Sequence, residues 1–198
     1  MIHPATELRW ISEKLGNGVV ATRAIPRGTI LWTQCEFDIV LSRPRLAALP
    51  DPYKKIAETY GYVDHRGDTI LCWDLGRFVN HACVPAMLPV DHHIEICVRD
   101  LAPGDELTCD YGSLNYDQHL ICHCNHPECR GTIAPEDVLA VGDAWLDSLR
   151  DALRVAPEVP QPLVPYLRFP QDWDDFLAGR KALPRSVAFY FSRTGVGA

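Results

Sequence analysis

The sequence lacks an apolar run that approaches the roughly 18 residues of a membrane span. Its first residues, MIHPATELRW, also lack a basic stretch followed by an apolar one. We therefore expect a soluble, intracellular protein of the cytoplasm or nucleus, without a membrane partner. Runs of Lys and Arg are absent too, and 19 basic residues face 26 acidic ones, a net charge of −7. Because phosphate binding needs clustered basic side chains, we expect no direct nucleic-acid partner, and a basic partner suits the chain better.

The first 110 residues contain short β-like runs separated by turns, with no internal repeat. Apolar and β-branched stretches flank the turn sequences GNG, at residues 16–18, and PRG, at residues 26–28. Residues 51–60 predict one short helix, with Asp51 as its cap and Pro52 at its first position. At 198 residues, the pattern predicts one main domain, mainly β, built of several small sheets with short helices.

A hairpin-like unit is predicted in the stretch HIEICVRDLAPGDELTCDYG. Ile94 and Ile96 alternate on one face of a strand, Pro103 and Gly104 form a turn, and the chain returns through Leu107.

After residue 134, apolar residues recur at the spacing of an α-helix. A C-terminal helix is predicted from the residues at this spacing, which are Val138, Val141, Trp145, Leu149 and Leu153. The next segment, APEVPQPLVPYLRFP, carries five prolines, so it should be an extended connector laid over the surface or against the core. A second short helix, capped by Asp172, follows it.

Eight cysteines in a reducing compartment favour free thiols and metal thiolates over disulfides. The segment CHCNHPEC, at residues 122–129, supplies three candidate zinc ligands, which are Cys122, Cys124 and Cys129. Structural zinc takes four ligands, so one donor is missing locally. His123 lies between two ligands on an extended chain and should point away from them. The local pattern leaves His126 and the distant Cys83, in a polar and proline-punctuated stretch, as rivals for the fourth position.

Four separated blocks, in this order, resemble the SET-domain protein lysine methyltransferases: GNGVVATRAIPRGTIL, RFVNHACVP, GDELTCDYG and CHCNHPECRG. They span residues 16–131. The last block is similar to the family's post-SET motif, Cys-x-Cys-x4-Cys followed by Arg-Gly. The resemblance implies a structural zinc whose fourth ligand is Cys83. It also implies a SET-domain fold of small sheets with a zinc-bound post-SET segment and a partly helical C-terminal extension.

The resemblance further implies S-adenosylmethionine as methyl donor. The implied donor-binding residues are Gly16, Asn17, Gly18, Arg77, Asn80 and His81. The two glycines let the backbone approach the donor closely. This chain reads NHACVPA where the family reads Asn-His-Ser-Cys-x-Pro-Asn, so Ala82 and Ala86 remove local hydrogen bonds.

Tyr111 is the implied catalytic residue, placed where the methyl group passes to a lysine nitrogen. We expect it to orient and stabilise charge, because a tyrosine with a pKa of about 10 is a poor base at neutral pH. Cys109 is the product-specificity candidate, since family members carry Phe or Tyr there and a smaller side chain leaves space for higher methylation. Alternatively, Tyr116 or an aromatic from the middle region fills that space.

The resemblance implies a protein-lysine N-methyltransferase that acts on a basic protein or peptide, a histone being the leading candidate. The alternative is a catalytically weak or inactive SET-like interaction module stabilised by zinc. We divide the chain into a SET domain at 1–115 with a variable insert at 36–68, a post-SET zinc segment at 116–133, and an extension at 134–198.

Overall fold

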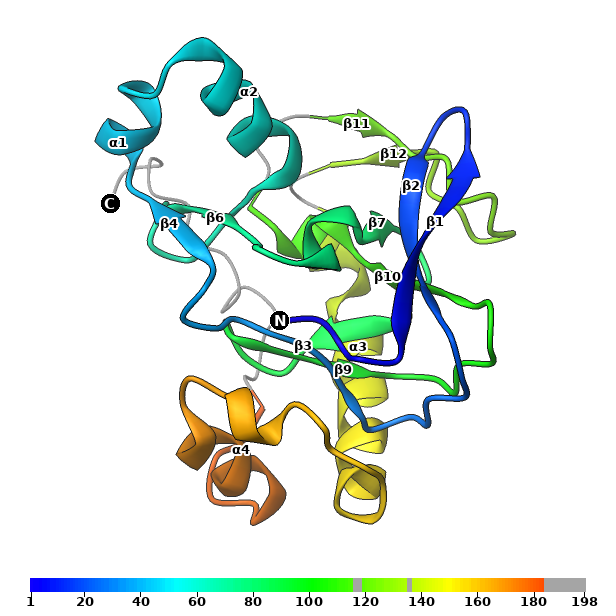
Figure 1. Cartoon of the computed structure of the whole chain (residues 1–198). Helices are drawn as coiled ribbons and strands as arrows, with labels where there is room; N and C mark the ends of the chain where they lie inside the picture. The colour runs from blue at the N-terminus through cyan, green and yellow to red at the C-terminus, as the bar shows by residue number, and fades with distance from the viewer. Residues whose placement is uncertain (116–118, 135–136, 184–198) are drawn as a thin grey trace.

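The computed structural model describes residues 1–115, 119–134 and 137–183 of the chain. Within them the predicted fold class is confirmed, because short strands form several small sheets and the helices are few (Figure 1). Tyr116 and the side chain of Val138 lie outside the described part. None of the described helices has the length and apolar composition that a membrane crossing requires.

A four-stranded sheet brings three distant parts of the chain side by side. Its strands, in spatial order, are β1 (Thr6–Ser12), β2 (Gly16–Ala21), β10 (Glu106–Cys109) and β7 (Asn80–His81). The turn before Gly16 joins β1 and β2 into an antiparallel hairpin. β10 lies antiparallel to β2 and parallel to β7, with Cys109 opposite His81.

The second sheet overturns the predicted hairpin. It contains β3 (Ile30–Thr33), β9 (Ile94–Cys97) and β8 (Met87–Pro89) in that order. β9 pairs with β3 and β8, whereas β10 belongs to the first sheet. The connection between them crosses from one sheet to the other, held by the reciprocal backbone hydrogen bonds of Ile25 and Leu101. Alternation and turn residues indicate two strands correctly, but they carry no information about which strands pair.

A third sheet and two helices form the middle of the chain. The sheet contains β4 (Ile39–Leu41), β6 (Thr69–Leu71) and β5 (Tyr62–Val63). The helices are α1 (Arg43–Ala47) and α2 (Asp51–Tyr60). The bounds predicted for α2 are confirmed, but its N-cap is Pro50, so Asp51 lies in the first turn and does not cap the helix. A carboxylate there still interacts favourably with the helix dipole.

The C-terminal extension covers the second sheet. α3 (Asp137–Val155) buries Trp145 and Leu149 in one apolar core with the sheet residues Ile94 and Ile96. The predicted C-terminal helix is therefore confirmed. α4 (Pro170–Leu177) adds Trp173 and Phe176 to that core, but its N-cap is Phe169, so Asp172 again lies in the first turn. In Figure 1 these two helices lie at the opposite end of the molecule from α1 and α2.

The proline-rich connector is not simply extended, since it contains two short 3-10 turns, η3 (Ala156–Glu158) and η4 (Val164–Tyr166). Gln161 anchors it: its amide oxygen accepts from the Ile30 N–H (2.9 Å) and its amide nitrogen donates to the Gly28 carbonyl (2.8 Å). Buried polar groups of the edge strand are satisfied in this way. The described part of the extension, up to residue 183, therefore completes the hydrophobic core.

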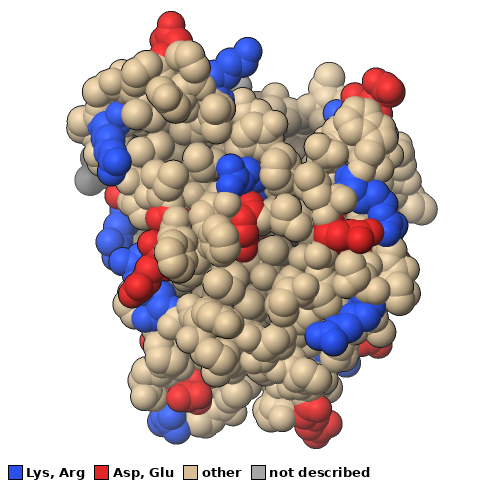
Figure 2. All heavy atoms as spheres, in the orientation of Figure 1, with Lys and Arg blue, Asp and Glu red and all other residues tan. Residues whose placement is uncertain are grey.

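Charges of both signs are interspersed on the face shown in Figure 2. The net charge of −7 does not appear there as one acidic surface.

Candidate functional site

The start of β2 lies beside Asn80 of β7. The Asn80 side-chain amide donates to the Asn17 carbonyl (3.1 Å) and to Glu106 Oε1 (2.8 Å). Gly18 permits this approach, because a Cβ on it would lie 2.8 Å from the Asn80 amide nitrogen and 2.3 Å from Glu106 Oε1. Gly16 has a φ of +70°, a conformation that favours glycine. The structure thus brings together the glycine turn and Asn80, which are separated by more than 60 residues.

The side chain of Arg77 makes a separate set of hydrogen bonds. Arg77 belongs to the short 3-10 helix η1 (Leu75–Phe78), and its guanidinium donates to the backbone carbonyls of Asp74 (3.1 Å) and Trp73. These bonds fix the chain entering β7. The structure therefore gives Arg77 local backbone contacts, without a hydrogen bond to Asn80.

His81 connects three parts of the site. Its Nδ1 accepts a hydrogen bond from the Tyr111 backbone N–H (3.1 Å), and its Nε2 lies 3.3 Å from Cys83 Sγ. Burial lowers the pKa of His81 to about 4, outweighing the opposite effect of Asp110. The ring is then neutral near pH 7 with its proton on Nε2, from which it donates to the Cys83 sulfur.

Tyr111 begins the 3-10 helix η2 (Tyr111–Ser113), and Asp110, which caps this helix, joins it to the end of β10. Its hydroxyl donates to the Val79 carbonyl (2.9 Å), which fixes the ring between β7 and a pocket of about 100 Å³. Cys109 lines the same pocket and is buried. Tyr62 of β5 also lines the pocket, and its ring packs edge-to-face against the Trp32 ring with 5.9 Å between the ring centroids. An aromatic side chain from the middle region therefore shares the space around Cys109.

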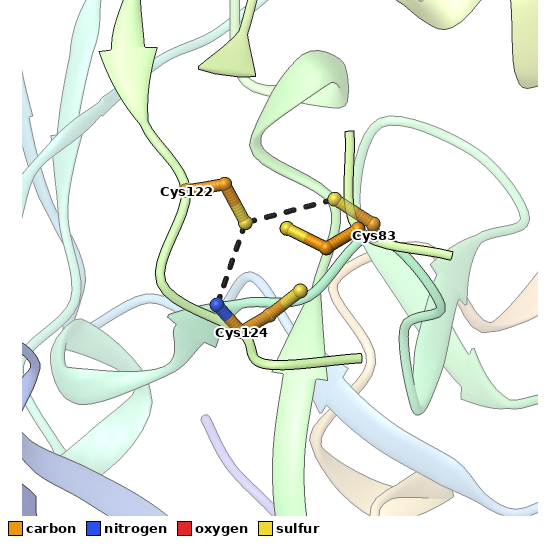
Figure 3. A group of neighbouring side chains, drawn as sticks. Cys83, Cys122 and Cys124 are labelled. Atoms are coloured by element: carbon orange, nitrogen blue, oxygen red, sulfur yellow. Dashed lines mark hydrogen bonds between the residues drawn. The ribbon is translucent and has the colours of Figure 1, made fainter. Parts of the chain in front are cut away.

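Four cysteine sulfurs converge where residues 122–131 meet the end of β7 (Figure 3). Cys83, Cys122, Cys124 and Cys129 place these atoms within 4.8 Å of one another, and Cys83 Sγ lies 3.6 Å from Cys122 Sγ. Tetrahedral zinc with Zn–S distances of about 2.3 Å places its sulfurs about 3.8 Å apart. Four thiols at this spacing fit a structural zinc ion.

Backbone N–H groups also point at these sulfurs. Arg130 N–H donates to Cys83 Sγ (3.3 Å) and Gly131 N–H donates to Cys129 Sγ (3.4 Å). Such donors stabilise thiolates. His126, the local rival, is exposed, and its Nδ1 accepts from the Glu128 N–H (3.1 Å). Among the described residues, Cys83 joins the group of potential ligands and His126 does not.

Arg130 is a site residue that the sequence reasoning missed. It forms a bidentate ion pair with Asp110, at 2.7 and 2.8 Å, and a second pair with Asp137 of α3 (3.0 Å). These pairs raise the pKa of Arg130 against the effect of burial. Asp110, fully buried beside Tyr111, therefore has a structural role. The Arg-Gly that follows the last cysteine is the signal that could have indicated this link.

Backbone hydrogen bonds hold the chain at Ala82 and Ala86, the two positions where this sequence differs from the family's Asn-His-Ser-Cys-x-Pro-Asn motif. Ala82 N–H donates to the Cys109 carbonyl (3.0 Å), and Ala86 N–H donates to Thr108, while the Ala86 side chain is fully buried. The chain path between β7 and β8 is therefore held without the serine and asparagine hydrogen bonds.

Comparison with protein-family models matches residues 16–112 to the model described as "SET domain". This range contains the glycine turn, Asn80, His81 and Tyr111, the residues that the structure gathers around the first sheet. The chain carries a SET domain. Histone-lysine methyltransferases are among its relatives, as the sequence resemblance implied.

Two relatives illustrate the extent of similarity. A Mycosarcoma maydis "Histone-lysine N-methyltransferase, H3 lysine-36 specific" is 27% identical over 170 residues, covering 76% of this chain and 16% of the relative. The rice (Oryza sativa subsp. japonica) "Histone-lysine N-methyltransferase TRX1" is 34% identical over 84 residues, covering 39% and 8%. The chain thus spans less than a fifth of these relatives. Among solved structures, the methyltransferase domain of human SETMAR aligns with a TM-score of 0.45 at 20% identity, covering 67% of this chain and 58% of that one.

Proposed function

We propose that this SET-domain chain is an S-adenosylmethionine-dependent protein-lysine N-methyltransferase that acts on a basic protein tail such as a histone. One observation carries the proposal: the glycine turn, Asn80 and the strand leading to Tyr111 meet in one sheet, and the Tyr111 ring borders a pocket. The names of the relatives support the same activity and favour a histone as substrate.

Donor binding is assigned to the glycine turn and β7. Gly16, Asn17 and Gly18 would offer main-chain groups to the donor, and Asn80 and His81 would contact its amino-acid end and its adenine. Arg77 would support these contacts through the backbone it holds. When bound, S-adenosylmethionine supplies an electrophilic methyl group. A charged and planar ligand of this kind needs a few placed polar groups around an apolar surface.

Tyr111 positions the reacting nitrogen. Its hydroxyl donates to the Val79 carbonyl, which fixes the phenol oxygen beside the pocket that the ring lines. Lysine must lose a proton before it reacts, at a cost of roughly 4 to 5 kcal/mol near neutral pH. Tyrosine has a similar pKa and is a poor acceptor for that proton. Positioning is accordingly the contribution we assign to Tyr111.

Zinc would be held by Cys83, Cys122, Cys124 and Cys129 and would tie residues 119–134 to the end of β7. We propose a structural role for it, since four thiolates leave no open coordination position. The domain division at 115 and 133 stays part of this proposal.

The proposal is tested by incubating the chain with labelled S-adenosylmethionine and core histones, comparing wild type with Tyr111→Phe. Label should enter protein with the wild type and fall at least about tenfold in the variant. The alternative, an inactive zinc-stabilised interaction module, predicts no transfer by either protein and unimpaired folding of both.

A further inference from the structure

The pocket beside Tyr111 contains an unusual share of unpartnered polar atoms. Among the described residues, five buried side-chain nitrogen or oxygen atoms lack a hydrogen-bond partner, although one of them, Arg130 Nε, forms the ion pair with Asp137. Three of them belong to residues that line this pocket, and they are Tyr62 Oη, His65 Nδ1 and Glu95 Oε2. Buried polar atoms are normally paired, so unpaired ones gathered around a cavity indicate a polar ligand.

Glu95 is directed into the pocket by the alternation of β9. Its neighbours Ile94 and Ile96 point into the core shared with α3, so the Glu95 side chain leaves the opposite face of the strand. There it lines the same pocket as Tyr62 and Cys109. Burial is the largest cause of the raised pKa values of these two side chains, and the charge of Glu95 raises them further. Glu95 is only 8% exposed, and no ion pair to it exists among the described residues.

The other charged groups of the pocket do not neutralise Glu95. Besides Tyr62, Cys109 and Tyr111, the titratable residues that line it are Tyr60, Asp64, His65, Cys72, Arg77, Asp91 and His92. Burial lowers the pKa of His92 to about 4 and raises that of Cys72 to about 12, so both are neutral near pH 7. Arg77 directs its guanidinium to backbone carbonyls. The pocket thus offers acceptors and a carboxyl group that pairs with no basic side chain among the described residues.

We propose that Glu95 binds the ammonium group of the substrate lysine and accepts its proton before methyl transfer. This inference rests on the proposed methyltransferase function. An ammonium carries three N–H donors and no acceptor, which matches a pocket whose unpaired atoms include a carboxylate oxygen and a phenol oxygen. A buried carboxylate without a partner is costly, and an incoming cation removes that cost.

The proton step balances within the pocket. One N–H bond of the ammonium breaks, its electron pair stays on nitrogen as the lone pair needed for attack, and an O–H bond forms on Glu95. Burial raises the pKa of Glu95 to about 7, so its carboxylate is present at neutral pH and is a better acceptor than an ordinary carboxylate. The pocket reaches the surface at Tyr60, which is 41% exposed, and the proton returns to solvent there before a further round.

Ammonium binding is tested without any methyl transfer, using n-butylammonium chloride as the probe and n-butanol as its uncharged counterpart. Calorimetry at about pH 8, where Glu95 is ionised, should show binding of the ammonium that weakens at least about tenfold in Glu95→Gln. The exposed Glu7→Gln variant is the matched control and should bind like wild type. Equal binding by wild type and Glu95→Gln would overturn the proposal.

Proton acceptance is tested by the pH dependence of kcat/KM with core histones. Near pH 7.5, kcat/KM of Glu95→Gln should be at least about tenfold lower than that of wild type. The difference in kcat/KM should disappear toward pH 10, where lysine loses its proton to water. A loss of the same size at both pH values would mean a structural role and would refute proton acceptance. If wild type methylates no histone but binds butylammonium through Glu95, the ammonium site is supported and the error lies in the proposed function.

Discussion

The buried carboxyl of Glu95 should reduce folding stability once it ionises. In the unfolded chain it ionises near its ordinary pKa of 4.5, whereas burial raises its folded-state pKa to about 7. Between these values the unfolded state has lost the proton and the folded state still holds it. By linkage, the free energy of unfolding falls as pH rises through this window, and the loss is complete above the folded-state pKa.

The size of the effect follows from the two pKa values. A rise from 4.5 to about 7 corresponds to ~3 kcal/mol, of which roughly 1 kcal/mol is already lost at about pH 5. Glu95→Gln keeps the shape of the side chain and does not titrate. Relative to wild type, this variant should therefore gain roughly 2 to 3 kcal/mol between about pH 5 and pH 8.

Urea denaturation of both proteins at about pH 5 and pH 8, at fixed zinc concentration, measures this gain. Any pH-independent cost of the amide cancels in the comparison, as do all other titrating groups. Glu7→Gln, at an exposed position, should show no such gain. A difference between Glu95→Gln and wild type that is the same at both pH values would refute the reasoning, because it would mean that Glu95 ionises as easily in the folded state as in the unfolded chain.

The remaining predictions concern the metal, the donor and the product. The Cys83→Ser variant should purify without zinc and the His126→Ala variant with zinc, which metal analysis of the purified proteins would measure. The reverse result would assign the fourth ligand position to the histidine. Asn80→Ala should weaken S-adenosylmethionine binding about tenfold in calorimetry because it removes the amide beside Asn17, whereas Tyr111→Phe should bind normally and turn over at least about tenfold more slowly. An unchanged turnover would remove Tyr111 from the mechanism. Although Tyr62 shares the pocket, the small side chain of Cys109 should let wild type carry a peptide past monomethyl-lysine, and Cys109→Tyr should shift the product toward monomethyl-lysine. Mass spectrometry at long reaction times measures the products, and a wild type that stops at one methyl group would mean that Tyr62 fills the space.

The sequence predicts the parts of the site that depend on local chemistry. The sequence alone reveals the paired glycines, the Asn-His pair and the close set of cysteines, because backbone freedom and metal ligation require particular residue types. The helix at α2 and the helix at α3 are predicted for the same reason, since proline position and apolar spacing are local properties. The choice of Cys83 over His126 needed either a family resemblance or the structure, because 39 residues separate Cys83 from Cys122.

Long-range pairing explains what the sequence did not predict. The strand at Ile94 and the strand at Leu107 lie in different sheets, which alternation cannot show. Gln161 looks like an ordinary loop residue until its amide meets the edge of β3. Because Glu95 lies between two isoleucines, the sequence pattern predicts that its side chain faces solvent on a half-buried strand. In the structure both faces of β9 are covered. Only the fold reveals that the Glu95 carboxylate enters the pocket.

The central claim is that this chain transfers a methyl group to the side chain of a lysine. Amino-acid analysis of core histones, after reaction with labelled S-adenosylmethionine and complete hydrolysis, tests it most directly because it identifies the atom that received the label. We expect the label in N-methylated lysine, and at least about tenfold less of it with Tyr111→Phe. Label in methylated arginine alone, or equal labelling by the variant, would contradict the account.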